Sequence, residues 1–177
     1  WQKMLVGNYL NEVGLKIKNI CILDLDILIN PNSPNIFDHH DKKKISVVSM
    51  LKYLPYDLNF IRKRISFNRN RFYSKKYKLD SALFMNIKQI YKYHKVKPQK
   101  DFACSGLVVF NSEKFSKKMK SWFYKYKKDI DTLTGGGEQP IWNYEVFKTG
   151  SVKILDYKFQ ALWIYEIAFK YPFLYEY

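Results

Sequence analysis

The stretch ICILDLDILI at residues 20–29 decides the fold prediction for this chain. Its residues alternate between two faces, and the face that is apolar throughout consists of Cys21, Leu23, Leu25, Ile27 and Ile29. The opposite face begins apolar and then carries Asp24 and Asp26. A strand that is apolar on both sides where it begins is typical of the middle of a sheet covered on both faces, as parallel sheets are. We therefore predict a central strand over residues 19–29.

Helical and strand periodicities alternate along the rest of the chain. Gly14 and Gly150 follow two of the helical segments, where glycine commonly ends a helix in the left-handed conformation. The apolar spacing predicts helices within residues 1–13, 80–91, 115–126 and 140–148, and strands within residues 45–54, 101–111 and 152–157. Such an alternation is typical of an α/β sandwich, and the length favours a single domain.

Length and composition exclude several classes of protein. The chain has 177 residues, of which 47% are hydrophobic and 18% aromatic, so it is neither disordered nor collagen-like. No apolar run approaches the ~20 residues that cross a bilayer. Cys21 and Cys104 provide neither a disulfide framework nor a zinc quartet. We therefore expect a reduced, cytoplasmic environment.

The charge of the chain favours anionic partners. There are 31 Lys and Arg against 16 Asp and Glu, a net charge of +15. The densest basic stretch, Leu58 to Leu79, has aromatic residues between its cations, as grooves for single-stranded nucleic acid do. Lysine and aromatic residues are abundant throughout, and no nucleic-acid-binding signature accompanies this stretch. We expect no nucleic-acid partner, and the alternative is a basic module that binds nucleic acid or contacts a membrane surface peripherally, without catalysis.

The acidic pair in the predicted central strand indicates a metal site. Asp24 and Asp26 are two positions apart, so on a strand their side chains point to the same side, about 6–7 Å apart. Both lie near the carboxyl end of the strand, where ligands bind in open α/β sheets. Two carboxylates there repel one another unless a cation joins them, and Mg²⁺ or Mn²⁺ binds carboxylates and substrate phosphates together. The alternative is a solvated pair at a strand end.

Three segments carry a family resemblance, in the same order along the chain. They are residues 20–29 with their Asp-x-Asp motif, residues 102–111 (FACSGLVVFN) and residues 137–143 (GEQPIWN). They resemble the metal-binding strand, the Phe-Asn-Ser/Ala-Gly strand with its trailing Asn, and the Asp-Gln-x-x-Leu-Asn helix start of GT-A fold glycosyltransferases, especially glycogenin-like and bacterial lipopolysaccharide galactosyltransferase-like enzymes. The resemblance implies a GT-A sandwich, a mixed sheet flanked by helices, that lacks its N-terminal strands.

The resemblance also implies binding roles for the matching residues. Asp26 would bind the metal ion, Mn²⁺ or Mg²⁺, and Asp24 would bind the metal or the ribose and sugar of the donor. Ser105 and Gly106 would line the sugar pocket, where small residues let the substrate approach the backbone. The trailing Asn111 would be a further substrate-binding residue.

The implied reaction is metal-dependent transfer of a hexose from a nucleotide-diphosphate sugar, a UDP-sugar first of all, to an acceptor hydroxyl. The acceptor would be a glycan or glycolipid of lipopolysaccharide or capsule type. Glu138 and Gln139 are the implied catalytic residues: Glu138 would deprotonate the acceptor in an inverting reaction. In a retaining reaction, which the resemblance favours, Gln139 would lie beneath the oxocarbenium-like centre while Glu138 orients the acceptor. The alternative for both residues is a structural role at a helix N-terminus.

The chain departs from the family in several places. Cys104 stands where the family commonly has Asn, and Glu138 replaces the more usual Asp. One predicted helix precedes the Asp-x-Asp strand, where the family has several strands and helices, and no histidine follows the last predicted strand. We therefore expect residues 1–177 to form a single glycosyltransferase domain that is truncated at both ends.

Overall fold

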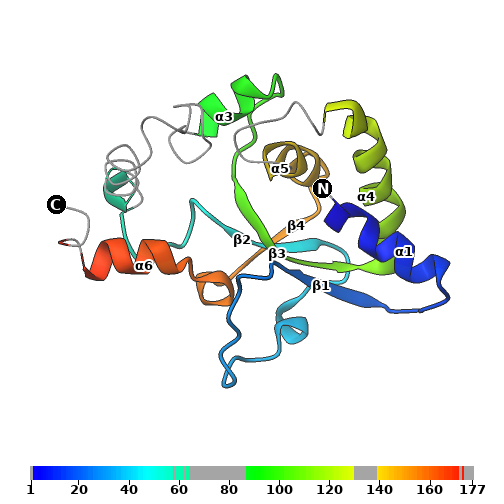
Figure 1. Cartoon of the computed structure of the whole chain (residues 1–177), viewed down its shortest axis with the longest axis horizontal. Coiled ribbons are helices and arrows are strands. Elements are labelled where there is room, and N and C mark those ends of the chain that lie inside the picture. The colour runs from blue at the N-terminus through cyan, green and yellow to red at the C-terminus, as the bar shows by residue number, and fades with distance from the viewer. Residues whose placement is uncertain are drawn as a thin grey trace.

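A four-stranded mixed sheet organises the computed structural model of this protein, which describes residues 2–57, 59–61, 63, 87–129, 139–171 and 173 (Figure 1). β3 runs antiparallel to both β1 and β2, whereas β2 and β4 are parallel. The carboxyl ends of β1, β2 and β4 therefore share one edge of the sheet, and β3 begins there. The strands, in the spatial order β1-β3-β2-β4, are β1 (Asn19–Leu23), β2 (Ile45–Ser49), β3 (Ala103–Asn111) and β4 (Val152–Leu155).

Helices pack on one face of this sheet (Figure 1). They are η1 (Gln2–Leu5), α1 (Val6–Glu12), α4 (Ser112–Tyr126) and α5 (Gln139–Lys148). Their apolar stripes meet the strand side chains of this face, because every second residue of a strand points to the same side. The buried side chains of this core include Ile20, Ile45, Val47, Val108, Phe110, Phe115, Met119, Trp122, Trp142 and Val146.

The opposite face of the sheet has a smaller core. Val48, Leu107, Val109, Leu155 and Tyr157 are buried there. Two short 3-10 helices contribute to this layer, η2 (Ile36–His39) and η4 (Tyr157–Gln160). β3 is therefore apolar on both faces, as a strand inside a covered sheet must be. Further along the chain, α3 (Ile87–Tyr93) and α6 (Trp163–Lys170) pack in two satellite clusters, and η3 (Lys127–Asp129) follows α4.

Most of the predicted elements are confirmed. Gly14 follows the end of α1 at φ +82°, and Gly150 follows the end of α5 at φ +66°. The predictions of a strand within 101–111, a helix within 115–126 and a helix within 140–148 match β3, α4 and α5. The α/β class and the mixed sheet flanked by helices are confirmed at this level.

The prediction of a long central strand over 19–29 is wrong in two respects. β1 ends at Leu23, because the chain turns there and the Ile27 N–H donates to the Asp24 carbonyl over 3.2 Å. Within the described part of the chain β1 is also an edge strand, paired with β3 alone. The apolar residues beyond the turn are not core, since Leu28 is 97% exposed.

The last part of the chain contains a helix that its sequence pattern did not predict. α6 exposes Trp163 and Phe169 while Tyr165 and Ala168 are buried, so its aromatic residues lie on more than one face. Among the described residues, no helix combines the length and the apolar character needed to cross a membrane.

Candidate functional site

The candidate site lies at the sheet edge where β1 ends and β3 begins. Asp24 is the first residue after β1, and its N–H donates to the Gly106 carbonyl over 2.9 Å. This hydrogen bond continues the β1–β3 ladder by one residue, so Asp24 lies directly opposite Gly106. The sequence motifs in residues 20–29 and 102–111 are therefore brought together.

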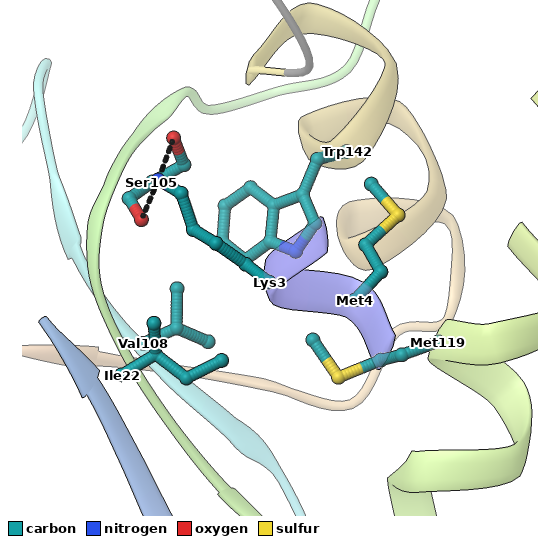
Figure 2. Close-up of a pocket in the computed structure, with 7 residues that line it drawn as sticks. All are labelled: Lys3, Met4, Ile22, Ser105, Val108, Met119 and Trp142. Atoms are coloured by element: carbon teal, nitrogen blue, oxygen red, sulfur yellow. Dashed lines mark hydrogen bonds between the residues drawn. The ribbon is translucent and has the colours of Figure 1, made fainter. Parts of the chain in front are cut away.

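Lys3 is the cation of this site. Its Nζ lies 2.8 Å from Oδ1 of Asp24 and donates to the carbonyl oxygen of Ser105 over 3.1 Å and to the Ser105 Oγ over 3.4 Å. Figure 2 shows the Lys3 side chain reaching from η1 to Ser105, with both hydrogen bonds drawn. Lys3 was not among the site residues predicted from the sequence.

The α5 helix brings Gln139 to the same place. The Oε1 atom of Gln139 accepts from the backbone N–H and the hydroxyl of Ser105, both at 3.4 Å. Asn143 fixes this helix to β3, because its side chain accepts from the Ala103 N–H over 2.7 Å and donates to the Ala103 carbonyl over 2.8 Å. Asn143 is fully buried, so these bonds are shielded from water. Gln139 is thus held against Ser105 by an anchor one helical turn further on.

Gly106 lets two polar side chains approach the backbone closely. A Cβ atom at this position would lie 2.6 Å from Nε2 of Gln160 and 3.1 Å from Oδ2 of Asp24. Gln160 ends η4, which follows β4 and so lies near the same sheet edge. We refer to Lys3, Asp24, Ser105, Gly106, Gln139 and Gln160 together as the Asp24 cluster.

Cys104 borders the Asp24 cluster as a partly buried thiol. Burial raises the pKa of Cys104, and the Asp24 carboxylate adds to this rise, although the Gly106 backbone, Lys3 and Gln160 oppose it. A raised pKa keeps the thiol protonated at neutral pH, so Cys104 is a poor nucleophile.

The two acidic residues lie in different surroundings, which corrects the prediction that both point from one strand face. Asp24 is half-buried beside Lys3, whereas Asp26 is exposed in the turn that follows β1. The described residues contain no group of three or more His, Cys, Asp or Glu side chains that could enclose a metal ion. Lys3 already pairs with Asp24, so Asp26 is the one of the two carboxylates that remains for a hard divalent cation, whose other ligands would be substrate phosphates and water.

Asp26 and Asn111 are predicted site residues that lie outside the cluster. Asn111 is at the other end of β3, where it caps α4 by accepting from the Lys114 N–H over 3.0 Å and lies 3.5 Å from the side-chain oxygen of Asn19. The structure does not bring Asn111 near Asp24. Glu138 lies outside the described residues, as does most of the basic stretch from Leu58 to Leu79.

A small cavity lies behind Lys3. Met4, Ile22, Val108, Met119 and Trp142 line it together with Lys3 and Ser105, and its volume is about 10 Å³ (Figure 2). A space of this size holds about one water molecule. It is therefore a packing gap beneath the cluster, and a sugar would have to bind on the outer side of Asp24.

Comparisons with protein-family models, with curated proteins and with solved structures found no match for this chain. Function is therefore inferred from the chemistry of the Asp24 cluster. The cluster combines one cation, one carboxylate, two carboxamides and a hydroxyl around a glycine. Several hydrogen-bonding groups around a close backbone approach suit a ligand with many hydroxyl groups.

Proposed function

We propose that this protein is a metal-dependent glycosyltransferase of the GT-A type, which transfers a hexose from a nucleotide-diphosphate sugar to an acceptor hydroxyl. The observation that carries the proposal is the position of Asp24, opposite Gly106 at the end of β1 and paired with Lys3. The mixed sheet with helices packed on it also supports the proposal, because a GT-A sandwich is expected to have that architecture. UDP-sugars are the first donors to test, and glycans or glycolipids the first acceptors.

In this proposal the two acidic residues have different tasks. Asp26 is exposed and binds the divalent cation, Mn²⁺ or Mg²⁺, together with the donor diphosphate. When bound, such a cation stabilises the negative charge on the diphosphate leaving group. Asp24 has one oxygen occupied by Lys3 and the other beside Gly106, so it binds the sugar side of the donor. The positive charge of Lys3 also attracts an anionic donor to this edge of the sheet.

The residues around Gly106 position the hexose. Ser105 and Gly106 allow the sugar to approach the backbone, and Gln139 presents its carboxamide beside Ser105. Gln139 is the residue proposed to lie beneath the reacting sugar carbon in a retaining reaction. Glu138 precedes it directly in the sequence and is proposed to orient or deprotonate the acceptor hydroxyl.

Ligand-dependent thermal unfolding tests this proposal. Mn²⁺ together with UDP should raise the unfolding midpoint of the wild-type protein, because binding to the native state alone stabilises it by about 2.7 kcal/mol at a hundredfold excess over Kd. Asp26→Asn should remove the shift while leaving the ligand-free midpoint unchanged. Glu113→Gln, at an exposed carboxylate in the first turn of α4, is the matched control and should keep the full shift. Equal shifts in wild type and Asp26→Asn would contradict the proposal.

A further inference from the structure

Gln160 has a buried polar atom without a partner. The side chain is 8% exposed, yet its Oε1 makes no hydrogen bond to any described residue. Native structures rarely leave a buried acceptor unpaired, and where they do, a ligand or an ordered water commonly completes it. Gln160 was not among the residues predicted from the sequence, and the proposed function gives it no role.

The carboxamide of Gln160 converges with Asp24 on one glycine. Its Nε2 and the Oδ2 atom of Asp24 lie 2.6 Å and 3.1 Å from the position that a Gly106 Cβ would occupy. The same side chain lies beside the Cys104 thiol, whose pKa it lowers. Residues that follow β1 and β4 therefore meet over the start of β3.

The free atoms of this group define the chemistry of the ligand. Oε1 of Gln160 can only accept a hydrogen bond, and the same holds for an ionised Asp24 carboxylate. Lys3 occupies Oδ1 of Asp24, which leaves Oδ2 on the Gly106 side. These acceptor atoms favour a ligand that donates hydrogen bonds, such as a sugar with adjacent hydroxyls.

We propose that Gln160 binds a hydroxyl group of the transferred hexose and, together with Asp24, selects the sugar of the donor. This inference rests on the proposed function, because the hexose is the polyhydroxylated part of that donor. It assigns Gln160 to sugar recognition, separate from the diphosphate, which lies with Asp26 and the cation.

Calorimetric titration separates the sugar from the nucleotide. In the presence of Mn²⁺, wild-type protein should bind UDP-glucose or UDP-galactose more tightly than UDP. Gln160→Met, which keeps the length of the side chain and removes both polar atoms, should bind UDP as the wild type does. It should lose most of the extra affinity for the UDP-hexose, about tenfold for one hydrogen bond to a neutral group. Gln99→Met is the control, because among the described residues the Gln99 amide bonds only to the nearby Lys97 carbonyl.

The thermal midpoint without ligand distinguishes sugar binding from a structural role. Removing an unpaired buried acceptor should leave the midpoint of Gln160→Met unchanged or higher. Gln160→Leu serves as a second variant of different shape, with the same expectation. A lowered midpoint in both variants, together with unchanged affinity for the UDP-hexose, would overturn the inference.

The remaining outcomes keep the two proposals apart. Equal affinity of the wild type for UDP and for both UDP-hexoses would overturn the role of Gln160 and leave the nucleotide site in place. The same conclusion follows if Gln160→Met binds the UDP-hexose as tightly as the wild type. If the wild type binds neither UDP nor a UDP-hexose, the proposed function fails and the role of Gln160 fails with it.

Discussion

The Nζ atom of Lys3 lies 2.8 Å from Oδ1 of Asp24, so the first helical turn of the chain is tied to the residue that follows β1. The two side chains are 27% and 39% exposed, which places the pair at the rim of the sheet and not in its core. Lys3 also holds Ser105 through two hydrogen bonds. One lysine therefore connects both strands that build the Asp24 cluster.

A double-mutant cycle measures this connection. Lys3→Met keeps the packing of the aliphatic stem and removes the charge, and Asp24→Asn removes the carboxylate charge. Because the pair is partly exposed, we expect a coupling free energy of about 0.5–1 kcal/mol at low salt, falling toward zero at about 1 M salt. Urea unfolding of the four proteins provides the measurement. A coupling that does not respond to salt would show that the contact is not an ion pair in solution.

Asn143 is expected to contribute more to stability than any surface polar residue of the site. Asn143→Ala leaves the buried N–H and carbonyl of Ala103 without their partners, which should lower the free energy of unfolding by about 3 kcal/mol. Asn8→Ala is the control, since the Asn8 side chain bonds to no described residue other than Glu12 on the surface of α1, and should change stability by about 0.5 kcal/mol or less. Urea midpoints that are the same for the two variants would refute the role of Asn143 as an anchor.

Gly106→Ala tests the close approach at the centre of the cluster. The new Cβ would displace the ends of Gln160 and Asp24, while φ at this position is not in the left-handed region. We expect a stability loss of about 1 kcal/mol and a roughly tenfold weaker binding of the UDP-hexose. Gly7→Ala should lower stability and leave the affinity for the UDP-hexose unchanged, because its Cβ would collide with Ser116 in the core between α1 and α4. Undiminished sugar binding by Gly106→Ala would remove Gly106 from the proposed pocket.

Glu145 gives the protein a defined sensitivity to acid. Burial alone would raise the pKa of Glu145, but the hydrogen bonds from Lys125 and Tyr126, at 2.6 Å and 2.5 Å, hold it below its ordinary value. A lowered pKa in the folded state contributes stability that is present above the unfolded pKa and is lost as the pH falls through the folded pKa.

The stability difference between wild type and Glu145→Gln should therefore shrink as the pH is lowered from 7 to roughly 3.5. Its size at pH 7 should be about 1 kcal/mol, because Lys125 is half exposed. Urea unfolding at a series of pH values measures it, with the exposed Glu113→Gln as control. A difference that is independent of pH would mean that the ionised form of Glu145 is not the stabilising one.

Much of the fold could be predicted from the sequence because the apolar residues of its core segments recur at the spacing of a helix or a strand. Phe115, Met119 and Trp122 form the stripe of α4, and all three are buried. The end of β1 could not be predicted in this way. Alternation treats every apolar residue as buried, yet Leu25 and Leu28 are exposed beyond a turn that a single backbone hydrogen bond closes.

Part of the candidate site could be predicted from sequence motifs. Asp24, Ser105, Gly106 and Gln139 lie in the three motif segments, and the fold brings them together. Lys3 and Gln160 were missed because neither belongs to a sequence motif, and each reaches the site by contacting a residue far away in the sequence. A signal for Gln160 was available: β4 is parallel to β2, so a polar residue shortly after β4 reaches the sheet edge where ligands bind.

The effect of Mn²⁺ on the affinity for UDP tests the central claim most directly. Calorimetric dissociation constants for UDP should be measured with and without Mn²⁺ for the wild type, Asp26→Asn and Glu113→Gln. We predict that Mn²⁺ tightens UDP binding at least about tenfold in the wild type and in Glu113→Gln, and not in Asp26→Asn. UDP binding that is independent of the metal ion, or a metal effect that survives in Asp26→Asn, would contradict the proposed role of Asp26.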